Sequence, residues 1–120
     1  MSIDLNQLDP EVRKQLQQLQ QMQQNFEFLQ NQKLQLESKQ REAELAIEEL
    51  NKLEPEEIVY KSIGGLMIKS KRDKLLDEKK NENTTLEMRL KTVNQKVERV
   101  KNQLETLRNK IQQSIQNQAA

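Results

Sequence analysis

The sequence predicts a mainly α-helical fold, a long antiparallel two-helix coiled coil with one central β-hairpin. Two heptad-patterned stretches of similar length flank a short β-branched segment, and the only two glycines lie side by side within that segment. Hydrophobic residues make up 33% of the 120 residues and aromatic residues 2%. These are too few large apolar groups for a compact mixed core. We therefore expect one elongated domain over residues 1–120.

The first helix is predicted over residues 10–54. Steps of three and four residues define a coiled-coil a/d seam from residue 5 to residue 54, and most of its positions are apolar. Asp9 can cap this helix and Pro10 suits its first position. Pro55 ends it, because proline cannot continue the backbone hydrogen bonds of a helix.

A β-hairpin is predicted over residues 58–70, with strands at about 58–63 and 66–70. The two glycines supply the positive φ angles that a two-residue type I′ or II′ turn requires. Both faces of the hairpin are then substantially apolar, and an isolated two-stranded hairpin is marginal in water. A coiled coil is too narrow to cover it, so we expect other chains to do so. The candidate oligomerisation residues are Val59, Tyr60, Ile63, Gly64, Gly65, Leu66 and Ile68.

The second helix is predicted over residues 72–116, where every seam position from Leu86 to Ile111 is apolar. Matched helices joined by a short connection favour an antiparallel pair. One register places Leu50 opposite Leu76 and Val12 opposite Ser114, although shifts by one heptad keep the same pattern. The first half of the chain is acidic and the second basic, so exposed pairs across the helices attract weakly. Polar residues interrupt the seam, either to fix its register or to permit bending, at Lys33, Gln40, Lys79 and Asn83.

Composition argues against several classes of function. The chain has no Cys and no His, so disulfides, thiolate metal sites and the usual general base are absent. We expect no enzymatic activity, no metal and no cofactor, because no catalytic constellation or glycine-rich phosphate loop is present. The first residues do not follow the pattern of a signal peptide, and the longest apolar run, 66–68, is too short to span a membrane.

The segment VYKSIGG, followed by LEMRLKT and flanked by two heptad helices, resembles the β class of prefoldin subunits, especially the archaeal type. The resemblance covers nearly the whole chain, and the single hairpin favours the β class because α-type subunits carry two. It implies a hexamer of two α-type and four β-type subunits, in which the hairpins join an intermolecular β-barrel. It also implies a cytoplasmic, ATP-independent chaperone that holds non-native proteins at the coiled-coil tips and delivers them to a group II chaperonin.

The candidate client-binding residues lie at the end of the coil formed by residues 1–19 and 107–120. There the seam loses matched partners, and apolar groups on a fraying end can contact an unfolded client without a shaped pocket. The alternative is that these groups complete the coil. The candidates are Ile3, Leu5, Leu8, Val12, Leu16, Ile111 and Ile115.

A basic cluster near the end of the second helix is a candidate docking surface for an acidic chaperonin. Cations are also expected at a helix C-terminus for electrostatic reasons alone. The cluster consists of Arg99, Lys101, Arg108 and Lys110.

The alternative function is a coiled-coil tether or an RNA-binding arm that uses the basic second helix. Binding of single-stranded nucleic acid usually requires aromatic stacking, and residues 72–116 contain no Phe, Tyr or Trp. A tether would not need the apolar hairpin. We therefore expect neither nucleic acid nor a membrane as a partner.

Overall fold

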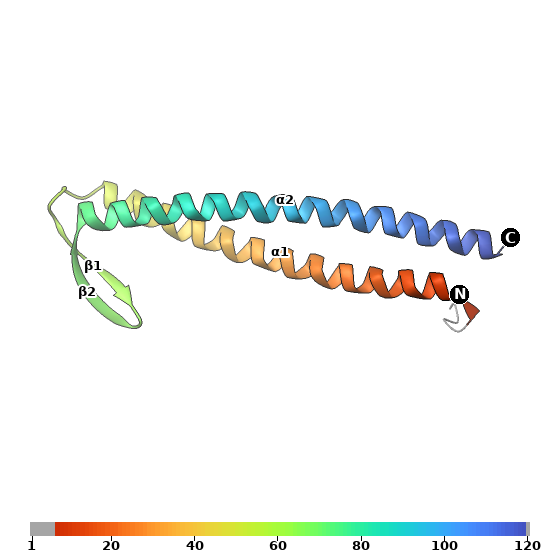
Figure 1. Ribbon diagram of the computed structural model, residues 1–120. Helices are drawn as coiled ribbons and strands as arrows, with labels where there is room; N and C mark the ends of the chain where they lie inside the picture. Colours follow the sequence, from red (N-terminus) through yellow and green to blue (C-terminus); the bar gives the residue numbers. More distant parts are fainter. Residues whose placement is uncertain (1–6, 120) are drawn as a thin grey trace. The chain divides into compact units, whose positions relative to one another are not determined.

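The computed structural model describes residues 7–119, and it confirms a mainly helical fold with one central antiparallel hairpin (Figure 1). The chain divides into two compact units, which we call the terminal unit (Met1–Gln32 with Val93–Ala120) and the hairpin unit (Lys33–Thr92). Each long helix contributes to both units. In chain order the elements are α1 (Pro10–Asn51), β1 (Ile58–Ile63), β2 (Leu66–Lys71) and α2 (Arg72–Ala119).

The helix ends differ slightly from the predicted ones. α1 ends at Asn51 rather than at 54, because the amides of Lys52 and Leu53 bond to carbonyls three residues back and tighten the last turn. A further turn follows around Pro55, whose ring disfavours a helical conformation for the residue before it. α2 continues to Ala119, beyond the predicted end at 116. Among the described residues, neither helix has a stretch apolar enough to cross a membrane.

The helix segments of the terminal unit run antiparallel in the predicted register. The backbone N–H of Asp9 donates to Gln118 Oε1 at 3.2 Å, and Gln118 Nε2 donates to the carbonyl of Gln7 at 2.9 Å. Gln118 thus bonds on both sides of residue 8, the residue it faces when the predicted pairing of Val12 with Ser114 is continued by one turn. A shift by one heptad would displace it by about 10 Å, so these bonds exclude the shifted registers. The buried core here comprises Leu8, Val12, Leu29, Val93, Val97, Val100, Leu104 and Ile111.

The helix segments of the hairpin unit meet in a leucine cluster where α1 ends and α2 begins. Leu50, Leu75 and Leu76 are buried together, which brings the predicted pair Leu50 and Leu76 into one core. Arg72 Nε donates to the carbonyl of Leu50 at 2.9 Å, which also accepts the amide of Leu53 at 3.1 Å, so this bond links the start of α2 to the last turn of α1. Half-buried side chains pack against the cluster, namely Ile47, Leu53 and Val59.

β1 and β2 pair in the predicted register, with Ile63 opposite Leu66, and β2 extends one residue further than predicted, to Lys71. Gly64 and Gly65 have φ angles of +54° and +83°, the two left-handed conformations of a type I′ turn. One face, which we call the Val59 face, carries Val59, Lys61, Ile63, Leu66, Ile68 and Ser70. The opposite face, the Tyr60 face, carries Ile58, Tyr60, Ser62, Met67, Lys69 and Lys71.

The four polar residues that interrupt the predicted seam are all half-buried. Lys79 Nζ lies 3.2 Å from Glu82 Oε2, whereas Asn83 Oδ1 is buried without a protein hydrogen-bond partner. A buried acceptor left without a partner costs about 1–3 kcal/mol. The amide nitrogen of the same side chain donates to Glu87 Oε1 at 3.5 Å, so Asn83 is satisfied on one side only. The four residues are Lys33, Gln40, Lys79 and Asn83.

Candidate functional site: hairpin faces and terminal coil

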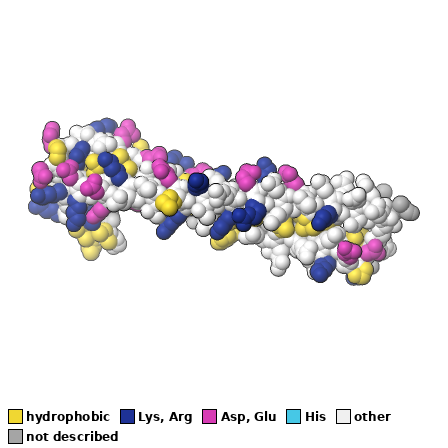
Figure 2. All heavy atoms as spheres, turned by 45° about the horizontal axis from the view of Figure 1, so that its top comes forward, with side chains coloured by type: hydrophobic (Ala, Val, Ile, Leu, Met, Phe, Trp, Pro, Cys, Tyr) yellow, Lys and Arg dark blue, Asp and Glu magenta, His cyan; other side chains and the backbone are white. Residues whose placement is uncertain are grey.

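Hydrophobic side chains are exposed on both faces of the hairpin, and Figure 2 shows a group of hydrophobic side chains on the hairpin from one side. On the Val59 face, 50% of Ile63, 68% of Leu66 and 40% of Ile68 is exposed. On the Tyr60 face the exposed residues include Tyr60 and Met67. An apolar patch beside free strand edges is suited to pairing with another chain. Of the predicted assembly residues, the structure thus brings Ile63, Leu66 and Ile68 together on one face and exposes Tyr60 on the other.

The coil covers the root of the Val59 face, so the prediction that the chain leaves this face uncovered is wrong there. Val59 is half-buried against the leucine cluster. Lys61 Nζ lies 3.3 Å from Glu78 Oε2 on α2. The reason is that β1 starts directly beside the end of α1, within reach of these side chains. The uncovered part is the half near the Gly64–Gly65 turn.

Several ion pairs surround the hairpin root. Lys71 pairs with Glu56 at 3.2 Å, and Lys52 pairs with Glu49 at 3.0 Å. The side-chain hydrogen bond with Glu49 raises the pKa of Lys52. All four side chains are well exposed, and such pairs contribute little to stability. No group of His, Cys, Asp and Glu within residues 7–119 could hold a metal ion.

The predicted client-binding residues are more covered than expected. The exposed fraction is only 8% for Leu8, 3% for Val12 and 6% for Ile111. The expectation that these three lack partners is therefore wrong, because Gln118 ties the helix ends together and the seam closes over them. Leu16 and Ile115 are half-buried. Ile3 and Leu5 lie outside the described residues.

The least covered part of the seam lies further along α1. Leu19, Met22 and Phe26 are half-buried, as is Leu107 on α2. Between Val12 and Leu29 no side chain of α1 is fully buried. Our sequence argument placed these groups in a closed seam and missed their exposure. Two signals could have found it, the Gln-rich composition of this stretch and a polar residue, Gln15, at a seam position, whose Oε1 is buried without a partner.

Two grooves flank these apolar groups within the terminal unit. We call the larger, of about 710 Å³, the Met22 groove; it is lined by Gln18, Gln21, Met22, Arg99, Asn102, Gln103, Thr106, Leu107 and Lys110. We call the smaller, of about 450 Å³, the Phe26 groove; it is lined by Gln23, Phe26, Glu27, Lys101, Leu104, Glu105 and Arg108. Both therefore combine apolar side chains with amides and cations.

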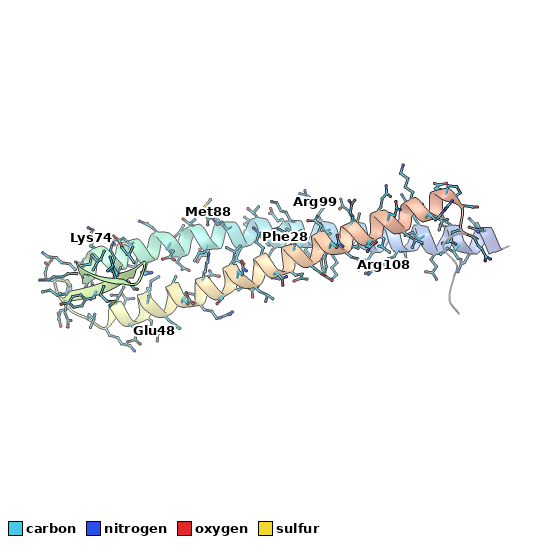
Figure 3. The ribbon with its side chains drawn as sticks, turned by 90° about the horizontal axis from the view of Figure 1, so that it is seen from below. Phe28, Glu48, Lys74, Met88, Arg99 and Arg108 are labelled. Atoms are coloured by element: carbon cyan, nitrogen blue, oxygen red, sulfur yellow. The ribbon has the colours of Figure 1, made fainter. Side chains whose placement is uncertain are left out.

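The predicted docking cations are all exposed on α2, and they divide between the two grooves. Arg99 and Lys110 line the Met22 groove, whereas Lys101 and Arg108 line the Phe26 groove. Figure 3 labels one member of each pair, Arg99 and Arg108. Within residues 7–119 none of the four takes part in an ion pair.

Comparisons with known proteins point to one family. A family model described as "Prefoldin subunit" matches residues 13–118. The chain is 42% identical over 108 residues to the prefoldin subunit beta of Methanothrix thermoacetophila, covering 90% of each chain. It is 36% identical over 110 residues to that of Methanosarcina acetivorans, covering 92% of this chain and 94% of the relative. The crystal structure of the prefoldin beta subunit from Thermococcus strain KS-1 superposes with a TM-score of 0.80 at 31% identity, covering 89% of this chain and 94% of that one. With the single hairpin between two long helices, these similarities show that the chain belongs to the prefoldin family of chaperone subunits.

Proposed function

We propose that this chain is the β-type subunit of a hexamer with two α-type and four β-type subunits. The hexamer holds non-native proteins without ATP and delivers them to a group II chaperonin in the cytoplasm. The observation that carries client holding is the half-buried apolar stripe of the terminal unit. The chain acts as one domain over residues 1–120 and has no enzymatic role.

Assembly through the hairpin is supported by its exposed apolar faces. Tyr60, Ile63, Leu66 and Ile68 need cover that this chain does not supply, and the two strands have free edges. Adding hairpins from neighbouring subunits into a β-barrel pairs the edges and buries the faces together. Val59 anchors the hairpin to its own coil.

Client holding is supported by apolar groups that one coil covers only in part. Leu16 and Ile115 belong to this set, and Leu19, Met22, Phe26 and Leu107 extend it. Each contact is weak, but several subunits acting on one client gain affinity by avidity. The buried groups Leu8, Val12 and Ile111 join only when the coil end opens, and Ile3 and Leu5 remain candidates.

Delivery to a chaperonin is supported by the four exposed cations, Arg99, Lys101, Arg108 and Lys110. They are suited to transient contact with an acidic partner surface, because rim charges accelerate association more than they add affinity. Independence from ATP is supported by the position of the two glycines in the hairpin turn, which leaves no glycine-rich phosphate loop.

The test is aggregation of a chemically unfolded client, followed by light scattering, with reconstituted hexamers at equal concentration. We expect protection with or without ATP. The double variant Leu19→Ser/Met22→Ser should reduce protection by about tenfold or more, because the lost contacts act together across several subunits. The matched control Leu34→Ser/Leu45→Ser removes as many apolar groups from exposed positions of α1 and should protect like the wild type.

Native mass spectrometry checks that both variants remain hexameric. A third variant, a deletion of residues 1–8 and 112–120, tests the predicted tip residues. Loss of protection in the deletion variant alone would move the client site to the ends of the chain. A wild-type hexamer that leaves the client to aggregate would overturn the function.

A further inference from the structure

We propose that the Met22 groove binds extended client segments in which acidic side chains flank an apolar one. The inference rests on the proposed holding function and names the class of segment that this groove prefers. Its counterpart on the other side of the coil, the Phe26 groove, has no such preference.

The floor of the Met22 groove suits an apolar side chain. Met22 and Leu107 are half-buried seam residues, so the coil itself does not complete their cover. The volume of about 710 Å³ lies within the range of ligand sites in proteins, about 300–1,000 Å³. Methionine is unbranched and adapts to differently shaped partners. The floor therefore accepts apolar side chains of varied shape, as a chaperone of many clients requires.

The rim of the Met22 groove suits acidic side chains. Arg99 and Lys110 line it, and no carboxylate does. The two cations are separated along α2 by about 16 Å, at 1.5 Å per residue, which is the length of about five residues of extended chain. Glutamine and asparagine side chains lie between them and can both donate to and accept from the backbone of an extended segment. They are Gln18, Gln21, Asn102 and Gln103.

The Phe26 groove provides the internal comparison. It also has two cations, Lys101 and Arg108, but Glu27 and Glu105 line it with them. Its charges therefore balance. The difference arises on both helices, because Glu27 of α1 and Glu105 of α2 line the Phe26 groove, whereas neither helix contributes a carboxylate to the Met22 groove.

A segment of a chaperonin is the competing occupant of the Met22 groove. A docking surface for an acidic chaperonin needs only the cations, and Lys101 and Arg108 are equally exposed. The Met22 groove also has an incompletely covered apolar floor between its two cations. An unfolded client can cover this floor, since the apolar side chains of an unfolded client are exposed. These features favour the client.

The experiment uses the reconstituted hexamer and two labelled twelve-residue peptides, followed by fluorescence anisotropy. Both peptides carry the same central leucines; one has glutamates five residues apart around them, and the other has glutamines. We expect the wild type to bind the glutamate peptide about tenfold more tightly, which corresponds to about 1.4 kcal/mol. Arg99→Gln/Lys110→Gln should abolish this preference. Lys101→Gln/Arg108→Gln removes the same charge and should retain it.

Three outcomes would overturn the inference. They are equal affinity of the wild type for both peptides, equal loss of preference in both variants, and loss of chaperonin binding in Arg99→Gln/Lys110→Gln with the peptide preference intact. The last would assign the groove to docking. Light scattering with an unfolded client separates these outcomes from failure of the proposed function. A wild-type hexamer that prevents aggregation but shows no peptide preference contradicts only the inference. A wild-type hexamer that fails to prevent aggregation contradicts the proposed function.

Discussion

Asn83 and Gln15 occupy seam positions where a coiled coil normally has apolar side chains. In both, the amide oxygen is buried and has no protein hydrogen-bond partner. Polar residues at such positions lower stability but can restrict a coil to one register. In this chain each unit has one such position, Gln15 in the terminal unit and Asn83 in the hairpin unit.

Replacing Asn83 by Leu should stabilise the isolated chain. The substitution removes an unsatisfied acceptor and adds apolar contact, so we expect the free energy of unfolding to rise by about 1–3 kcal/mol. Urea denaturation followed by circular dichroism measures the change. The control Asn81→Leu lies on the exposed surface of the same helix and should alter stability by less than about 0.5 kcal/mol. A destabilised Asn83→Leu chain would show that the amide makes a favourable interaction.

At the scale of elements, the leucine cluster joins three elements of the hairpin unit. Leu50 comes from α1, Leu75 and Leu76 come from α2, and Val59 of β1 packs against all of them as a group. The Lys61–Glu78 pair adds a second contact between β1 and α2. The hairpin is therefore held at its root, while the half that carries Ile63 and Leu66 is available to other chains.

Truncating Leu50 should be far more costly than truncating its neighbour Leu45. Leu50 is 7% exposed and Leu45 61% exposed. Leu50→Ala creates a cavity in the cluster and should lower the free energy of unfolding by about 2–5 kcal/mol. Leu45→Ala should change it by less than about 0.5 kcal/mol. Denaturation of both variants in urea gives the comparison, and equal losses would mean that the cluster does not stabilise the chain.

At the scale of the whole molecule, the surfaces proposed for assembly and for client holding consist of different residues. The exposed apolar faces belong to the hairpin unit, and the half-buried stripe with its two grooves belongs to the terminal unit. Substitutions in the stripe should therefore leave assembly intact. Substitutions on the hairpin faces should leave the client contacts of a single subunit intact, but not the avidity that several subunits provide.

Replacing Ile63 and Ile68 by Asp should dissociate the hexamer without unfolding the helices. Two carboxylates would be buried without partners in the proposed barrel, at a cost of several kcal/mol. Analytical ultracentrifugation should detect smaller species, while circular dichroism should still report most of the helix. Leu34→Asp/Leu45→Asp is the control, since it places the same charges on exposed helix positions. Hexameric sedimentation of the hairpin variant would exclude the hairpin from the assembly surface.

Local features of this chain were predictable from the order of its residues. The start of α1 at Pro10, the pairing of Ile63 with Leu66 and the glycine turn between them all follow from backbone preferences of a few neighbouring residues. The heptad spacing indicated two helices for the same reason. These properties are local, so no knowledge of the partner helix was needed.

The register and the covered surfaces required the folded chain. Heptad-shifted helices present the same apolar pattern, and only the Gln118 bonds and the Leu50–Leu76 contact exclude the shifts. Likewise, the pattern marked Val12 as partnerless and Met22 as enclosed, whereas Val12 is buried and Met22 is half open. The cover of a side chain depends on the size and position of groups on the opposite helix, and those are set by packing between segments far apart in the chain.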